Sequence, residues 1–452
     1  MQTLMVSPFR KTPRHPLLLV TGLFTTALIS SNFFGVNLSP VSAQTPSETT
    51  NQAQDEDDET ALPNQFTPNP LLEKLITDPL LPTLSPNQSL SETQRQSLSN
   101  ALEQLHLEAE DLWRRGKIWE AFTLWNRELQ LRRYLGTAAE IDALTRVGRV
   151  ARIENQPLQL KWVTERLQII QAELLSATQI DVLQLQALAI AFQEVRAKNP
   201  AIEVYQQLLT LARAQGNTTA EMAMIKAMGD WYLQWLDYSN AGIIYEQLLD
   251  LQQTYIPVSP EPILNNPQGN RPPEPPQIQS LRTLARIYEQ QGKPLEAIAA
   301  QERLVDFYLT QQNLLKVPQL KLEIGQNYQE LGQYRLAGQY YQETYSLALP
   351  IEQFAIASVA LEKLAGLYRS QDKMEAALQI YQAQLAVEQR SYNVYGMMTT
   401  YDQIGEVFLA LRAYPQALNA FKQGQELSRL LGGYHPEYFS DKINRLNRRI
   451  ER

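Results

Sequence analysis

The residue types that support metal binding or covalent catalysis are scarce in this sequence. It has no cysteine, which removes disulfides, thiolate metal ligands and thiol nucleophiles. The three histidines, His15, His106 and His435, lie far apart along the chain, so no histidine metal cluster or catalytic triad is predicted. Glycine-rich phosphate loops and dinucleotide fingerprints are also missing. We therefore predict no cofactor, no metal and no enzymatic activity.

Two arginine pairs are the residues best suited to bind a ligand. Arg149 and Arg152 are three residues apart, and Arg282 and Arg286 are four apart, so each pair shares one helix face. A guanidinium binds a carboxylate through two parallel hydrogen bonds, so the pairs predict an acidic or carboxylate-bearing partner. The alternative is internal compensation, for example of Arg286 by Glu289, with solvent screening the remaining charge.

These arginines belong to a repeated unit that is clearest at Ser280–Leu304. Apolar or small residues follow Leu281 at the i+3, i+4 and i+7 positions, which is the spacing of one helix face. Gly292 ends this helix, and Pro294 suits the first turn of a second one. The unit is therefore predicted to be two helices joined by a tight turn.

Eight copies of this unit can be aligned on a small residue of the first helix, which we call the marker. The markers are spaced by 39 to 41 residues, apart from one step of 56. They are Ala109, Gly148, Ala189, Gly229, Ala285, Gly325, Ala365 and Gly405. One helix pair cannot bury both of its faces alone, so registered copies predict a stack of pairs, an α-solenoid.

Repeat five reads L-x-x-L-A-x-x-Y-x-x-x-G-x-x-x-x-A, and this pattern resembles the tetratricopeptide repeat (TPR) family from about Leu98 to Leu431. The resemblance implies an all-α fold, a right-handed α-solenoid of about eight TPR-like helix pairs. The unit here is 40 residues rather than about 34. In the family, such long units occur in proteins that bind extended peptides in their groove. Repeat two departs most from the pattern, with Asn155, Leu160 and Thr164 at its glycine, alanine and aromatic positions.

The groove of such a solenoid is lined by first-helix residues at marker −3, +1 and +4. We select eight residues in the first helices as candidate partner-binding residues: Trp113, Arg149, Arg152, Lys226, Arg282, Arg286, Gln326 and Arg369. Chaperone-binding members of the family place asparagine at marker +1 to hold a terminal carboxylate. None of the eight repeats has it, so we do not transfer that activity.

The N-terminal 43 residues have the pattern of a secretory signal peptide. Basic residues precede the apolar run Leu17–Ile29, and Val41-Ser42-Ala43 offers a small-x-small cleavage site. We therefore expect an exported protein, periplasmic or lumenal. The alternative is an uncleaved membrane anchor, because Leu17–Val36 reaches about 20 residues, the minimum for a span.

The rest of the chain divides into six predicted parts. They are a disordered acidic linker (44–69), an N-terminal capping segment (70–97), repeats one to four (98–255), a proline-rich loop (256–277), repeats five to eight (278–432) and a C-terminal capping helix (433–452). Ser91 and Gln94 predict a capping box at the start of a helix reaching Arg115. In the last helix, Ile443, Leu446 and Ile450 should cover the open end, with Lys442, Arg445, Arg449 and Arg452 on its other face.

These observations favour a non-catalytic exported scaffold that binds a protein or extended peptide in the groove. The formal net charge of −8 and aromatic residues at core positions argue against a nucleic-acid partner. The alternative is a membrane-tethered assembly factor for a membrane complex. In this alternative the chain resembles exported TPR proteins of photosynthetic bacteria that assist the assembly of membrane complexes. An enzyme subunit is a third hypothesis that no visible site supports. We expect a monomer.

Overall fold

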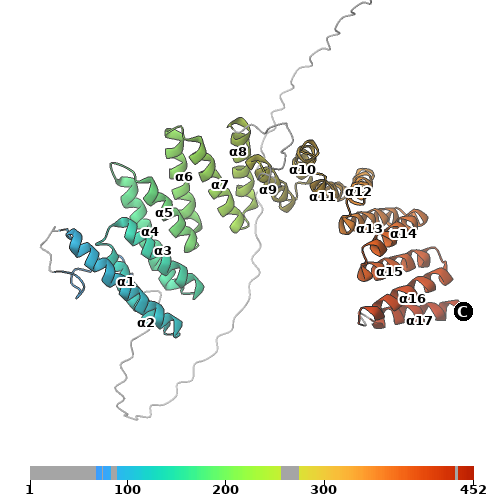
Figure 1. The fold of residues 1–452 in the computed structure, drawn as a ribbon, viewed down its shortest axis with the longest axis horizontal. Helices are drawn as coiled ribbons and strands as arrows, with labels where there is room; N and C mark the ends of the chain where they lie inside the picture. The colour runs from blue at the N-terminus through green and yellow to red at the C-terminus, as the bar shows by residue number, and fades with distance from the viewer. Residues whose placement is uncertain (1–67, 74, 83–88, 256–273, 433–435, 452) are drawn as a thin grey trace, which may run out of the picture. The chain divides into compact units, whose positions relative to one another are not determined.

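The computed structural model describes residues 68–73, 75–82, 89–255, 274–432 and 436–451. The predicted signal peptide, most of the acidic linker and residues 256–273 lie outside them. The described residues form seventeen α-helices and one short 3-10 helix, η1 (Leu314–Lys316), with no strand among them (Figure 1). The predicted all-α class is confirmed.

The helices alternate between first and second members of a pair. The first helices are α1 (Glu92–Arg114), α3 (Thr137–Ile153), α5 (Val182–Glu194), α7 (Thr218–Gln234), α9 (Pro276–Gln290), α11 (Val317–Glu330), α13 (Phe354–Ser370) and α15 (Val394–Ala410). The second helices are α2 (Ile118–Arg132), α4 (Pro157–Ser176), α6 (Lys198–Ala214), α8 (Tyr238–Tyr255), α10 (Pro294–Thr310), α12 (Tyr334–Ala348), α14 (Met374–Arg390) and α16 (Tyr414–Leu430). One further helix, α17 (Pro436–Ile450), follows the eighth pair.

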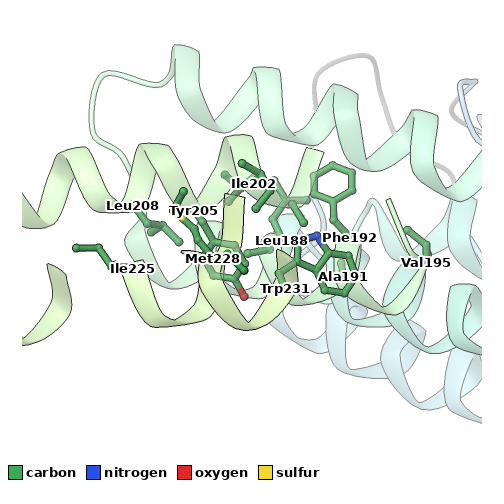
Figure 2. Packing of buried hydrophobic residues seen from close by; sticks show 14 of the residues in the cluster. Leu188, Ala191, Phe192, Val195, Ile202, Tyr205, Leu208, Ile225, Met228 and Trp231 are labelled. Carbon is green, nitrogen blue, oxygen red and sulfur yellow. The ribbon is translucent and has the colours of Figure 1, made fainter. Parts of the chain in front are cut away.

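Each helix packs on its neighbours in the sequence, so the eight predicted pairs form an α-solenoid (Figure 1). Figure 2 shows the result for α5, α6 and α7, whose buried side chains meet in one layer that includes Phe192, Tyr205 and Trp231. All three are at most 7% exposed, so neighbouring pairs share one continuous core.

The turn inside every pair uses a left-handed backbone at marker +7. Gly116, Gly292 and Gly332 have φ of 78°, 65° and 70° there, as their lack of a Cβ permits. The other five repeats place residues with side chains in the same conformation: Asn155, Arg196, Leu236, Asp372 and Arg412, with φ from 49° to 60°. A fixed turn explains why the register survives where the glycine does not.

Repeat two is irregular, as its sequence suggested. First helix α3 packs directly on α5, the first helix of the next pair, and α4 contacts α5 only weakly. The marker Gly148 permits this approach, because a Cβ on it would lie 2.4 Å from Cγ1 of Val195. Because Gly148 has no side chain, the C-terminal end of α5 can pack against it.

Repeats one and two also bury charged side chains. Arg166 of α4 donates two hydrogen bonds to Glu140 of α3, at 2.6 and 3.0 Å, and both residues are at most 4% exposed. In the first pair, fully buried Glu128 contacts Arg132 at 3.0 Å and Nδ1 of His106 at 2.9 Å. His106, at marker −3, is thus buried and does not line an open face.

Residues on both sides of the predicted boundary between linker and capping segment contact the repeats. Ser91 and Gln94 form both hydrogen bonds of the predicted capping box, at the start of α1. Ahead of it, residues 68–73 and 75–82 contain isolated turns and no helix. Asp78 pairs with Arg127 of α2 at 2.8 Å, and Nδ2 of Asn69 donates to the carbonyl of Trp162 in α4 at 3.0 Å. These residues therefore contact two repeats.

Helices α8 and α9 pack as ordinary neighbours although the proline-rich stretch separates them in sequence. Nε2 of Gln277 donates to the carbonyl of Gln252 at 3.1 Å, and Tyr288 donates to Glu246 at 2.9 Å. The predicted loop extended to residue 277, but α9 begins at Pro276, since proline is well suited to the first helical turn.

The C-terminal helix α17 covers the last pair with two of the three predicted residues, Ile443 and Leu446, and with Phe439, which was not predicted. Phe439 and Leu446 are 2% and 3% exposed, whereas Ile450 is 45% exposed and covers little. Lys442, predicted to lie on the face away from the repeats, contacts Asp402 at 2.6 Å and Glu406 at 2.8 Å. Burial opposes its charge, but hydrogen bonds to these two carboxylates and Tyr438 raise the pKa of Lys442. This lysine therefore ties α17 to α15.

Candidate partner-binding face

The arginine pair of repeat two is neutralised within the chain. Arg149 donates two hydrogen bonds to Glu194 of α5, at 3.1 and 3.2 Å, and Arg152 donates to the Glu194 carbonyl at 2.9 Å. The Glu194 carboxylate raises the pKa of Arg149. This supports the alternative of internal compensation, through a residue 45 positions away in the sequence.

Three further candidates also have partners within the chain. Nε1 of Trp113 donates to Glu154 at 2.8 Å, and Lys226 contacts Asp230 one helical turn away at 2.5 Å. Arg369 donates to Gln403 and, at 3.4 Å, to the hydroxyl of Tyr381. The remaining candidate of the later repeats, Gln326, is half-buried on α11.

Repeat five differs, because its three predicted groove positions line one hollow. Arg282, Arg286 and Glu289 lie on α9, at marker −3, +1 and +4, and they border a hollow of about 490 Å³. Its walls also include residues of α10, η1, α11 and α13: Gln301, Leu304, Tyr308, Leu315, Lys316, Gln319, Leu320, Glu323 and Ile356. We call this the α9–α11 hollow. It is the place where the structure brings predicted candidates together.

Arg282 already has a carboxylate partner in the hollow's wall. It contacts Glu274, just before α9, at 2.6 Å, and hydrogen bonds with the hydroxyl of Tyr308. Burial opposes ionisation of Glu274, but hydrogen bonds from Tyr308 and Arg282 outweigh it and hold the pKa of Glu274 below its usual value. Glu274 therefore contributes as a carboxylate at neutral pH.

Arg286 and Glu289 do not pair as suggested from the sequence. Arg286 is exposed and makes no ion pair with any described residue. Glu289 accepts a hydrogen bond from Nε2 of Gln301 at 2.7 Å, and Asn327 donates to the oxygen of that same amide at 2.9 Å. Both amides are buried, so this series of hydrogen bonds holds Glu289 toward the hollow.

A second carboxylate, Glu323 of α11, was missed by the sequence pattern because it lies at marker −2. It accepts a hydrogen bond from Nε2 of Gln319 at 2.9 Å. Burial raises the pKa of Glu323, and burial followed by repulsion from Glu323 raises the pKa of Glu289. Gln301 was the sequence signal that could have pointed to this polar site, because it replaces the aromatic residue usual at marker +16.

The described residues contain no group of three or more histidine, aspartate or glutamate side chains placed to hold a metal ion. No helix within the described ranges combines the length and hydrophobicity needed to cross a bilayer.

The stacked helix pairs, with the α9–α11 hollow on the face of the first helices, make this chain an α-solenoid protein. Residues 356–437 match the sequence model of the tetratricopeptide repeat family. No curated protein matches the sequence.

Solved structures of low sequence identity are also similar. BtubC (BKLC) from P. vanneervenii is 18% identical over 53% of this chain and 94% of its own, with a TM-score of 0.36. A putative kinesin light chain from Podosopora anserina is 15% identical over 46% and 94%, with a TM-score of 0.35. Aspartyl phosphate phosphatase F from Bacillus subtilis is 14% identical over 67% and 78%, with a TM-score of 0.38.

Proposed function

We propose that this chain is a non-catalytic adaptor that binds a protein or an extended peptide on the face formed by its first helices. A tetratricopeptide-repeat solenoid fits a protein-binding scaffold. The observation that carries the proposal is the α9–α11 hollow, where all three predicted groove positions of repeat five meet apolar and polar side chains of four other elements.

The proposal includes export of the protein and action as a monomer. Export is supported by the basic N-terminus, the apolar run Leu17–Ile29 and the small residues before Gln44. The mass of the protein recovered from the exporting cell separates a cleaved form from a tethered one, because cleavage after Ala43 removes 43 residues.

Site-specific photocrosslinking tests the assigned face. A benzoylphenylalanine at Arg286 or Gln326 of the first helices should trap a protein in the producing cell. The same group at Arg303 or Gln342, exposed positions on second helices, is the matched control. Adducts formed only from second-helix positions would show that the partner binds the opposite face, and absence of any adduct would contradict the adaptor function.

A further inference from the structure

The α9–α11 hollow has two chemically different ends. Along α9, Arg282 and Arg286 precede Glu289, so positive charge gives way to negative charge along the helix. Three residues of helix separate Arg286 from Glu289, which is about 4.5 Å along the axis. Leu304, Leu320 and other apolar side chains also line the hollow.

The hollow is lined by two cations that make no ion pair within the described residues, Arg286 and Lys316. Arg282 is neutralised by Glu274, but Arg286 makes no ion pair in the described parts of the chain. Elsewhere on the first helices Arg149, Arg152 and Lys226 have carboxylate partners. Arg286 therefore stands out among the predicted basic residues as a free guanidinium at a cavity.

The carboxylates at the negative end, Glu289 and Glu323, likewise have no charged partner among the described residues. Gln301 and Gln319 donate hydrogen bonds to Glu289 and Glu323, but both donors are neutral amides. No lysine or arginine among the described residues lies within ion-pair distance of either carboxylate. Burial raises the pKa of both glutamates, and repulsion from Glu323 adds to the rise at Glu289. A cation placed here would relieve both burial and repulsion.

We propose that the α9–α11 hollow binds a partner segment that inserts a lysine or arginine side chain at Glu289 and Glu323 and sets a carboxylate beside Arg286. This rests on the proposed adaptor function and names the chemistry of its partner. An extended chain advances about 3.3 Å per residue, so the two charged residues of the partner lie one or two positions apart. An apolar residue next to them packs on Leu320 and Ile356.

This assignment changes the partner predicted from the arginine pairs. A purely acidic segment would satisfy Arg286 but would meet Glu289 and Glu323 with like charge, which costs binding energy. A purely basic segment would satisfy the glutamates and be repelled by Arg286 and Lys316. Charge complementarity therefore selects a segment that carries both signs in a fixed order.

Selection of peptides on the purified full chain tests the proposal. Random twelve-residue peptides displayed on phage are selected, and the affinities of the enriched peptides are measured by fluorescence anisotropy. We expect enriched sequences to contain lysine or arginine one or two residues from aspartate or glutamate. Glu289→Gln/Glu323→Gln should weaken their binding about tenfold or more, as for a lost charge-assisted hydrogen bond. Arg286→Gln should cause a smaller loss that disappears for peptides whose acidic residue is replaced by glutamine.

The control variant Asp250→Asn/Glu296→Gln removes the same charge from the hollow bordered by α8 and α10 and should leave the affinities unchanged. Enriched peptides that lack a basic residue, or that bind the double glutamate variant as tightly as the original chain, would overturn the charge assignment alone. Failure to enrich any peptide, together with absence of photocrosslinks from the first helices, would overturn the adaptor function itself.

Discussion

Gly325 in α11 lies directly against the ring of Tyr341 in α12: a Cβ on the glycine would be 2.6 Å from Cε1 of the tyrosine. The same relationship joins Gly229 to Tyr245 and Gly405 to Phe421, at 2.8 and 2.4 Å. In each pair the aromatic residue follows the marker by sixteen positions. In these three repeats the marker is therefore small because an aromatic ring of the second helix in the same repeat packs against it.

Replacing Gly325 by alanine should destabilise the protein by about 1–3 kcal/mol, the usual cost of overpacking a core. Tyr341 is fully buried and its ring has little room to move. Chemical denaturation followed by circular dichroism measures the effect. The matched control is Gly366→Ala in α13, where a Cβ meets nothing within 4 Å. That variant should be more stable by about 0.5–1 kcal/mol, because alanine favours helix. Equal effects of the two substitutions would contradict the packing explanation.

The turn at marker +7 predicts a gain of stability in repeat four. Leu236 has φ of 55° and is 69% exposed, so its side chain contributes little burial while its backbone is unfavourable. Leu236→Gly should stabilise the protein by about 0.5–1 kcal/mol. The reverse change, Gly292→Ala at the equivalent turn, should destabilise by about 1 kcal/mol. Thermal melting of both variants checks the opposite signs.

Sequence alone could reveal the repeat and its turns because both depend on contacts within one unit. Gly292, the small residue Ala285 and the first turn at Pro294 all act within twenty residues of one another. The charges of the candidate site depend instead on how successive units stack. Glu194 reaches Arg149 across 45 residues, and Glu323 approaches Glu289 from the next first helix. Local spacing therefore placed Arg282, Arg286 and Glu289 on one helix face but wrongly paired Arg286 with Glu289.

Glu274 should make the stability of the folded protein fall as the pH is lowered. Its folded-state pKa is depressed, so its contribution is present above the unfolded-state pKa and is lost as pH falls through the folded-state pKa. Glu274→Gln should therefore lower the melting temperature at neutral pH, and the difference from the original chain should vanish in strong acid. A constant difference at all pH values would mean that shape, rather than charge, explains the contact.

Glu323 should have the opposite effect on the pH dependence of stability. Burial raises its folded-state pKa, so the stability it contributes is fully present below the unfolded-state pKa and is lost as pH rises through the folded-state pKa. Glu323→Gln should then raise the melting temperature at neutral pH and have little effect in acid. The same pH series used for Glu274 provides the comparison. A loss of stability at neutral pH would show that the chain already neutralises this carboxylate.

The final prediction concerns how far a local defect spreads along the solenoid. All six tryptophans lie between Trp113 and Trp235, so fluorescence reports on repeats one to four, whereas the far-ultraviolet helical signal reports on all repeats. Glu140→Gln leaves the buried guanidinium of Arg166 with Glu173, at 3.4 Å, as its one charged partner among the described residues.

Removing one partner of a buried ion pair costs about 3–5 kcal/mol. Because each repeat contacts only its neighbours, this loss should move the fluorescence transition to lower denaturant and make the helical transition biphasic. The control Glu426→Gln breaks the exposed pair with Arg429 and should change neither signal, since such pairs contribute little. If both signals instead shift together in Glu140→Gln, the eight pairs unfold as one cooperative unit.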